Sequence, residues 1–422
     1  MSAPLAGVRI LEVSMFAPDA VGMHLADLGA EVIKVEAPGL GDPARLLGLP
    51  LDGESPATRR WNRGKYSIAI DLRSPDGAAL FRELAAKSDA VVEGMRPGSL
   101  ERRGLGHAAL LETNPRLVFA SVSGWGEQGP YRDLGAHGLA FDAWAGLAPP
   151  RKDAGRPTRP EGHVWQGLEA GPLFAAFAIV SAILEARSGG RPRRIEVSQA
   201  DAAAVWNGWH IAYEAAAHEE PESDAEARRA QLERIQALAA SAELESPEGP
   251  EGSPANDVRY QYYAASDGHI LLMATEKRFW KNFCEAIDRM DLFERWPGRS
   301  PADHDHGNEA LRSELTAIFA TRTRAEWVSL FLEHDVAGAP VYESGEAWQD
   351  VHFATRELWT PAEIHGMRVP GSPLRIDGEI ALAPRAAPKH GVDTHHVLRH
   401  VLGYDDARID ELQEKHAVES KQ

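Results

Sequence analysis

The first 125 residues alternate between short apolar strands and helices, and this rhythm restricts the possible folds more than any other feature of the chain. Runs of β-branched and aliphatic residues without a helical period predict strands at 8–13, 31–36, 67–72, 89–93 and 117–123. Helices are predicted at 20–28, ended by Gly29, and after the N-cap residue Ser74, which is followed by Pro75. The alternation predicts an α/β fold with a Rossmann-like parallel sheet covered on both faces.

Beyond this region the composition changes twice. Residues 219–251 are rich in glutamate and read as a solvated linker. YQYYAASDGHILLMAT at 260–275 then predicts two strands joined by an Asp-Gly turn, followed by helices. We therefore expect four segments: a large Rossmann-like domain over 1–216, an acidic linker over 217–258, a small α/β domain over 259–335, and a C-terminal return to the large domain over 336–422.

Charge and cysteine content exclude some classes of protein. The chain of 422 residues has a net charge of -18, which argues against nucleic-acid and membrane partners. The longest apolar run, 172–184, is shorter than the roughly 20 residues of a membrane span. No signal peptide is apparent, and the single cysteine, Cys284, fits a reducing compartment. We expect a cytoplasmic protein.

Basic residues gather near the predicted strand ends, although the usual dinucleotide fingerprint G-x-G-x-x-G is missing from the first strand-to-helix turn. They are Arg63, Lys65, Arg73, Arg96, Arg102 and Arg103. In an open α/β sheet, ligands bind at the carboxyl ends of the strands. Arginines at that edge, in an otherwise acidic chain, suit a ligand that carries phosphate, unless they are ordinary surface charges.

Several stretches together resemble the class III coenzyme A transferase family, the group of formyl-CoA transferase, carnitine CoA-transferase and α-methylacyl-CoA racemase. They are ADLGAEVIKVEAPGLGDPAR, NRGKYSIAIDLRSPDG, VVEGMRPGSLERRGLG and NPRLVFASVSGWGEQGPYRD. The resemblance implies a large Rossmann-like domain built from both ends of the chain, a small central domain, and an interlocked homodimer. It implies acyl-CoA and carboxylic acid substrates, with coenzyme A as a substrate and no tightly bound cofactor. No metal site is expected, because the histidines of DHDHGN (303–308) and THHVLRH (394–400) do not form a metal-binding pattern.

The resemblance also implies where coenzyme A lies. The implied contacts are Ile70, Asp71, Leu72, Arg73, Gly94, Met95, Arg96, Arg102, Ala136 and His137.

The catalytic position of the family is altered in this chain. In the transferases an aspartate just before a long apolar helix attacks the acyl-CoA, and its D-x-x-x-G pattern falls on Gly167 here. Glycine has no side chain, so the nearest carboxylate, Glu169, is the candidate substitute. The competing interpretation is that Glu169 only compensates the helix dipole, with Pro172 marking the start of the helix.

Two further residues point to the racemase branch of the family. His137 lies at the position of the histidine in the Gly-His-Asp motif that the racemases resemble. Glu276 lies where the racemases carry a glutamate beside aromatic residues. A histidine and a carboxylate could move a proton at the carbon α to a thioester, or His137 could only line the coenzyme A site. Three hypotheses follow: a CoA-transferase, an α-methylacyl-CoA racemase or epimerase, and a non-catalytic acyl-CoA-binding homologue. The resemblance to the transferase family favours the first.

Overall fold

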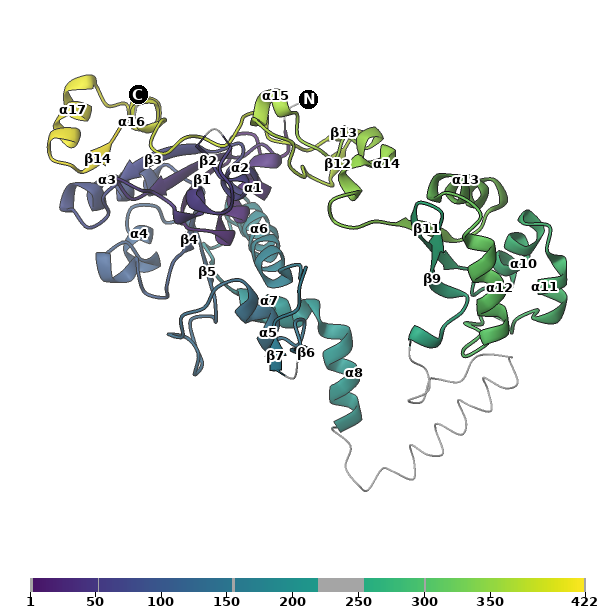
Figure 1. The fold of residues 1–422 in the computed structure, drawn as a ribbon. Coiled ribbons are helices and arrows are strands. Elements are labelled where there is room, and N and C mark those ends of the chain that lie inside the picture. Colours follow the sequence, from purple (N-terminus) through teal and green to yellow (C-terminus); the bar gives the residue numbers. More distant parts are fainter. Residues whose placement is uncertain (1–2, 52, 154–155, 219–253, 300, 421–422) are drawn as a thin grey trace. The chain divides into compact units, whose positions relative to one another are not determined.

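The computed structural model describes residues 3–51, 53–153, 156–218, 254–299 and 301–420 (Figure 1). The chain divides into two compact units. The first contains residues 1–215 and 353–422, and the second contains residues 216–352. The first unit is thus assembled from both ends of the chain.

A seven-stranded sheet forms the centre of the first unit, in the order β14-β3-β2-β1-β4-β5-β8. Its strands are β1 (Arg9–Ser14), β2 (Glu31–Glu36), β3 (Tyr66–Ile70), β4 (Ala90–Gly94), β5 (Val118–Ser123), β8 (Arg194–Ser198) and β14 (Val418–Glu419). All neighbouring pairs are parallel except β14 and β3. The predicted parallel sheet is confirmed, and its order reverses direction between β1 and β4, where a doubly wound sheet opens a crevice.

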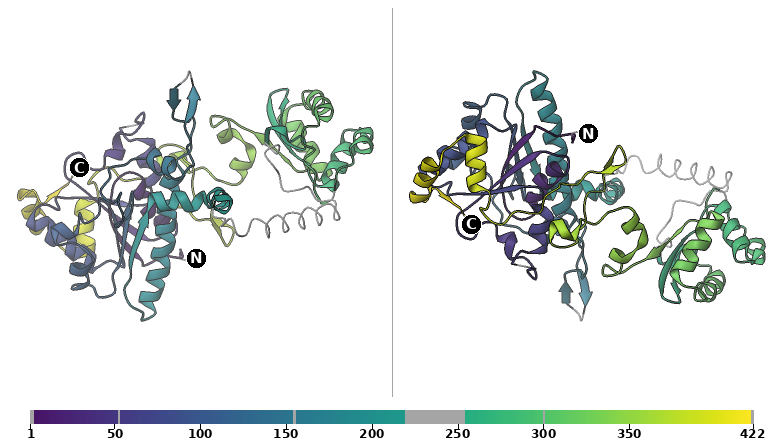
Figure 2. Two further views of the ribbon diagram at one scale, coloured as in Figure 1. Left: turned by 90° about the horizontal axis from the view of Figure 1, so that it is seen from below. Right: turned by 90° about the horizontal axis from the view of Figure 1, so that it is seen from above.

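Helices cover both faces of this sheet (Figure 2). Alternate residues of each strand face opposite sides, so Ile10 packs in one core and Leu11 in the other. One face carries α1 (Ala20–Asp27) and α6 (Gln166–Arg187), and the other carries α3 (Pro75–Ala86), α4 (His107–Leu111), α16 (Thr394–Leu402) and α17 (Asp406–Glu414). The N-cap at Ser74 is confirmed, because its hydroxyl accepts a hydrogen bond from the Gly77 N–H at 3.0 Å.

Shorter elements complete the first unit around the sheet. They are η1 (Ala17–Asp19), η2 (Pro43–Leu46), α2 (Pro56–Trp61), η3 (Glu101–Arg103), α5 (Leu139–Trp144), β6 (Arg151–Asp153), β7 (Arg156–Thr158), α7 (Gln199–Trp206), α8 (Gly208–His218), α14 (Val351–Thr355), α15 (Ala362–His365), β12 (Arg375–Ile376) and β13 (Glu379–Ile380). Helix α8 ends three residues beyond the unit boundary at Ala215, and helix α14 begins two residues before the boundary at Phe353.

Helix α6 differs from the prediction at its start. It begins at Gln166, so Pro172 lies inside the helix rather than at its first turn. A carboxylate from a distant part of the chain, Asp142, satisfies the N–H groups that start α6, and this allows the helix to begin six residues early. Among the described helices, α6 alone is long and apolar enough to cross a membrane by length and composition, and its buried face packs in the core of the first unit.

The second unit is a small α/β body. Its three strands, in the order β11-β10-β9, are β9 (Tyr260–Ala265), β10 (Gly268–Met273) and β11 (Gly338–Val341). The predicted hairpin with its turn at Asp267 is confirmed. The other elements are η5 (Pro254–Asn256), α10 (Lys277–Ala286), α11 (Met290–Arg295), α12 (Glu309–Phe319), α13 (Arg324–His334) and η6 (Ala347–Gln349).

The limits of the second unit differ from the expected 259–335. Strand β11 pairs with β10, which keeps residues up to 352 in this unit, so the return to the first unit starts at Phe353. At the other end, Val258 is buried in the core of the second unit. Residues 219–253, most of the expected acidic linker, lie outside the described residues.

Candidate functional site

A cavity of about 690 Å³ opens where the strand order reverses. Its walls include the residues that follow β1 (Met15 and Phe16) and those that end and follow β4 (Gly94 to Arg96). Segments after β5 and from α2, α5, α6 and α7 close the sides. The cavity therefore lies at the topological switch point, where an open α/β sheet binds its ligands.

The charged residues that line the cavity are exposed, whereas its buried lining residues are uncharged. The arginines that line it, Arg96, Arg132 and Arg159, are all exposed residues, as is His137. The buried part of the lining is uncharged and mostly apolar, with Phe141 2% exposed and Val122 1% exposed. This separation suits a ligand with one anionic end and one apolar end.

Phe16 takes an unusual backbone conformation in this wall. Its φ is 61°, a left-handed value that is uncommon outside glycine. The Phe16 N–H donates to both carboxylate oxygens of Asp42 at 3.3 Å, and its ring lies edge-on to His137 with 6.1 Å between ring centroids. Asp42 thus holds the residue that packs against His137 in the cavity.

A buried network of charges lies behind this wall. The Lys34 ammonium contacts Asp19 at 2.5 Å and Asp42 at 2.9 Å, with all three side chains at most 1% exposed. Burial, followed by the neighbouring Asp19 carboxylate, raises the pKa of Asp42 to about 7. For Glu36, hydrogen bonds from Arg45 and the charge of Lys34 outweigh the effect of burial and lower the pKa to about 2. The network fixes the loop between β1 and α1 that forms the cavity wall.

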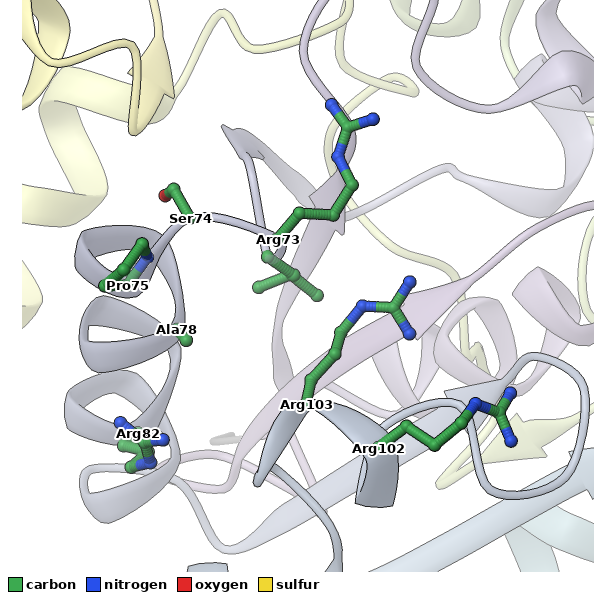
Figure 3. A pocket seen from close by; sticks show the side chains of 8 residues that line it. Arg73, Ser74, Pro75, Ala78, Arg82, Arg102 and Arg103 are labelled. Carbon is green, nitrogen blue, oxygen red and sulfur yellow. The ribbon is translucent and has the colours of Figure 1, made fainter.

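A second pocket, of about 580 Å³, is rich in arginine (Figure 3). Of its eight lining residues four are arginines and none is acidic: Leu72, Arg73, Ser74, Pro75, Ala78, Arg82, Arg102 and Arg103. Figure 3 shows Arg82 on α3, with Arg102 and Arg103 on η3 opposite. Asp71, next to the pocket, pairs with Arg73 at 2.8 Å, and this hydrogen bond lowers the pKa of Asp71. The concentration of guanidinium groups suits phosphate.

One turn links the pocket and the cavity. A Cβ added to Gly98, whose φ is 76°, would lie 3.0 Å from an Arg102 nitrogen and 3.8 Å from an Arg132 nitrogen. Arg102 lines the pocket, whereas Arg132 and Pro97 line the cavity. The two hollows therefore flank the same loop after β4.

Eight of the ten residues expected to contact coenzyme A line these two hollows, and Ile70 and Asp71 do not. Leu72, Arg73 and Arg102 line the pocket, and Gly94, Met95, Arg96, Ala136 and His137 line the cavity. Ile70 is different, because its side chain is 1% exposed in the core and leaves only its backbone for a ligand. Their role as coenzyme A contacts stays a prediction.

The position of the family nucleophile is enclosed. A Cβ added to Gly167 would lie 3.1 Å from each of three atoms: Ala203 Cβ, the Gln199 carbonyl oxygen and Asp142 Oδ1. The Asp142 carboxylate, which is fully buried, accepts hydrogen bonds from the Gly167 N–H at 2.8 Å and the Gln166 N–H at 2.9 Å. It also lies 2.9 Å from His163 Nε2. A carboxylate is thus present beside position 167, but as the cap of α6.

Glu169, the candidate substitute, faces another partner. Both of its oxygens accept hydrogen bonds from Arg60 on α2, at 2.5 and 2.7 Å. Its side chain is 39% exposed and is not among the residues that line the cavity, although its neighbour Leu168 is. Glu169 would have to leave Arg60 to reach a ligand there.

Glu276 belongs to the second unit. It is the exposed residue just before α10, and its carboxylate accepts a hydrogen bond from the Thr275 hydroxyl at 3.0 Å. A joint role for His137 and Glu276 stays a prediction.

Asp142 is a site residue that the sequence alone did not indicate. The only signal in the sequence was an aspartate within the apolar stretch LAFDAW (139–144). It lies four residues after Gly138, and Gly138 is the position at which the family resembled here has an aspartate. Its pairing with the start of α6 spans 25 residues of sequence, so no local pattern predicts it.

Comparison with known proteins gives one consistent family. The sequence profile described as CoA-transferase family III matches residues 5–394. Human succinyl-CoA:glutarate CoA-transferase is 28% identical over 417 residues, which is 97% of this chain and 88% of that protein. A probable fatty acyl-CoA transferase of Mycobacterium tuberculosis is 30% identical over 78% of this chain and 79% of its own length.

Solved structures agree with this result. A crystal structure of Rv3272 from M. tuberculosis has a TM-score of 0.70 and 27% identity, and the match covers 93% of this chain and 99% of that one. A CAIB/BAIF family protein from Brucella suis also has a TM-score of 0.70, at 23% identity, with 95% and 100% covered.

Proposed function

Because this chain belongs to CoA-transferase family III, we propose that it transfers coenzyme A from an acyl-CoA to a carboxylic acid. One observation carries the proposal: an arginine-rich pocket and a cavity whose buried lining is uncharged flank the loop after β4 at the switch point of the sheet. Named relatives that act on acyl-CoA and acid pairs, such as the acetyl-CoA:oxalate CoA-transferase of Acetobacter aceti, support it.

In this proposal the nucleotide end of coenzyme A binds at Arg73, Arg82, Arg102 and Arg103. The pantetheine chain passes Gly98 and brings the thiol into the cavity. Charge-assisted hydrogen bonds from guanidinium to phosphate hold the nucleotide end.

We expect calorimetry to detect binding of coenzyme A, and Arg102→Gln with Arg103→Gln to weaken it by about 10- to 100-fold, because two charge-assisted contacts are lost. Pantetheine, which lacks the nucleotide, is the control ligand, and its affinity should not change. Arg399→Gln, an arginine on α16 outside both hollows, is the matched control variant. No binding of coenzyme A at millimolar concentration would contradict the proposal.

Transfer needs a carboxylate that attacks the thioester carbonyl. A C–O bond forms, the C–S bond breaks and the coenzyme A thiolate leaves. The thiolate then attacks the other carbonyl of the resulting anhydride, and the donor acid leaves as its carboxylate. The acceptor acid can supply the attacking carboxylate itself when both substrates are bound together. We favour this route here, because Gly167 has no side chain and Arg60 holds Glu169.

Glu169→Gln tests this assignment. The substitution should leave coenzyme A affinity and transfer little changed, because Glu169 does not line the cavity and its partly exposed ion pair contributes only about 1 kcal/mol to stability. Arg60→Gln should behave in the same way, since it breaks the same pair. Transfer rate and trapping of an acyl-enzyme by hydroxylamine are the measurements. If Glu169→Gln loses both transfer and the hydroxamate that the unaltered protein forms, and Arg60→Gln keeps both, Glu169 is the nucleophile.

His137 keeps a second function open, since it lines the cavity beside Phe16. An epimerase would exchange the proton at the carbon α to the thioester, so incubation in deuterium oxide would place deuterium there. Deuterium uptake without transfer would favour the epimerase. Coenzyme A binding without either reaction would favour an acyl-CoA-binding homologue.

We also propose that the protein is a homodimer. The support is a set of large apolar side chains exposed on neighbouring helices: Phe174, Phe177 and Leu184 on α6, Val205 and Trp206 on α7, and Trp209 on α8. Burying such a surface against a second copy would stabilise the pair. Light scattering that gives the mass of a single 46.0 kDa chain would contradict this proposal.

A further inference from the structure

Among the lining residues of the cavity that the structure describes, none of the buried ones is charged. Every charged residue and the histidine in the lining fall in the exposed class: Arg96, Arg132, Asp133, His137 and Arg159. The buried lining residues are neutral, and only Trp61, Ser123 and Gln199 among them have polar side-chain atoms.

Aromatic and aliphatic side chains supply most of the interior surface. Trp125 meets Phe141 edge to face, with 5.6 Å between ring centroids, and Leu168 packs against this cluster and against the one that contains Trp61. The volume of about 690 Å³ leaves room for a bulky group.

We propose that the acyl group handled at this site is neutral and apolar, branched or aromatic, rather than one that ends in a second carboxylate. This inference rests on the proposed function, in which the thioester lies in the cavity. A dicarboxylic acyl group that enters the buried part of the cavity would bring its free carboxylate next to Phe141, Val122 and Leu168, where none of the buried lining residues is a cation. Burial of an unpaired carboxylate is strongly unfavourable, whereas burial of an alkyl or aryl group in the same space is favourable.

Several relatives are named for dicarboxylates such as succinate and glutarate. The acyl group that we propose for this chain differs from these, because it has no second carboxylate. The exposed arginines of the cavity, Arg96, Arg132 and Arg159, remain available for the carboxylate of the acceptor acid, while the arginines of the pocket hold the phosphates.

Two thioether analogues of acyl-CoA give a matched test by calorimetry. S-(4-methylpentyl)-CoA and S-(3-carboxypropyl)-CoA have the same number and arrangement of heavy atoms, but one ends in an isopropyl group and the other in a carboxylate. A thioether cannot be transferred, so binding is measured without turnover. We expect the isopropyl ligand to bind at least about tenfold tighter than the carboxylate ligand and tighter than free coenzyme A.

A change of charge in the interior sharpens this test. Gln199→Lys adds a cation to the buried wall and should reverse the preference of the two thioethers. Gln128→Lys, at an exposed position outside the lining, is the matched control and should leave the preference unchanged. If Gln199→Lys does not fold, the comparison of the two ligands on the unaltered protein still decides the question.

The outcomes separate this inference from the function on which it rests. Equal affinity of the two thioethers, or tighter binding of the carboxylate ligand, would overturn the inference and leave CoA transfer intact. Preference for the isopropyl ligand without any transfer would support the inference and reject the proposed activity.

Discussion

Lys34→Met is expected to lower the free energy of unfolding of the first unit by about 3–5 kcal/mol, because it leaves two buried carboxylates without their cation. Asp19 and Asp42 each contact the Lys34 ammonium, and none of these side chains is more than 1% exposed. Chemical denaturation, followed by circular dichroism, measures the loss. Lys415→Met is the matched control, because Lys415 pairs with Glu411 on the surface of the same unit, and its unfolding transition should barely move.

The same substitution should also affect the site. Asp42 accepts a hydrogen bond from the N–H of Phe16, which has a left-handed backbone conformation. The side chain of Phe16 forms part of the cavity wall. A folded Lys34→Met protein should therefore bind acyl-CoA more weakly than the Lys415→Met protein does. An unfolding free energy equal to that of the unaltered protein would show that the buried network is not a source of stability.

Gly167→Asp, which restores the residue type of the family at this position, is expected to cost about 2–3 kcal/mol of stability. A Cβ there would already lie 3.1 Å from three neighbouring atoms, one of them a carboxylate oxygen of Asp142. The new carboxylate would then lie next to an existing one, and like charges in a buried site repel each other.

Two further variants separate the steric effect from the charge effect. Gly167→Ala should show the steric part alone. Asp142→Asn combined with Gly167→Asp should recover part of the loss, with a coupling of about 1 kcal/mol or more between the two positions. Simple additivity of the two substitutions would contradict the proposed competition between the carboxylates. The double variant is also the one in which a carboxylate at 167 can be tested as a nucleophile.

The sheet could be predicted from the sequence because its strands are buried on both faces and read as continuous apolar runs. The hairpin of the second unit followed from an Asp-Gly turn, and α3 followed from Ser74 and Pro75. These signals are local, and each element carries its own. The lining of both hollows was partly predictable as well, because parallel strands end at one edge of the sheet.

Features that depend on distant partners could not be predicted. Helix α6 starts at Gln166 because Asp142, far away in sequence, accepts its first N–H groups. Glu169 is paired by Arg60, which lies 109 residues away. The extent of the second unit depends on β11 adding a third strand to a hairpin that ends 65 residues earlier, at Met273. In each case the deciding contact leaves no pattern in the local sequence.

An isotope-exchange measurement tests CoA transfer most directly. The protein is incubated with an acyl-CoA and the deuterium-labelled free acid of the same acyl group, and mass spectrometry follows the label. A panel of branched, aromatic and dicarboxylic acyl groups covers the substrate classes. We predict that the label enters the thioester for at least one neutral acyl group, with no net loss of acyl-CoA. If coenzyme A binds but no label enters any thioester of the panel, the chain does not transfer coenzyme A between these acids.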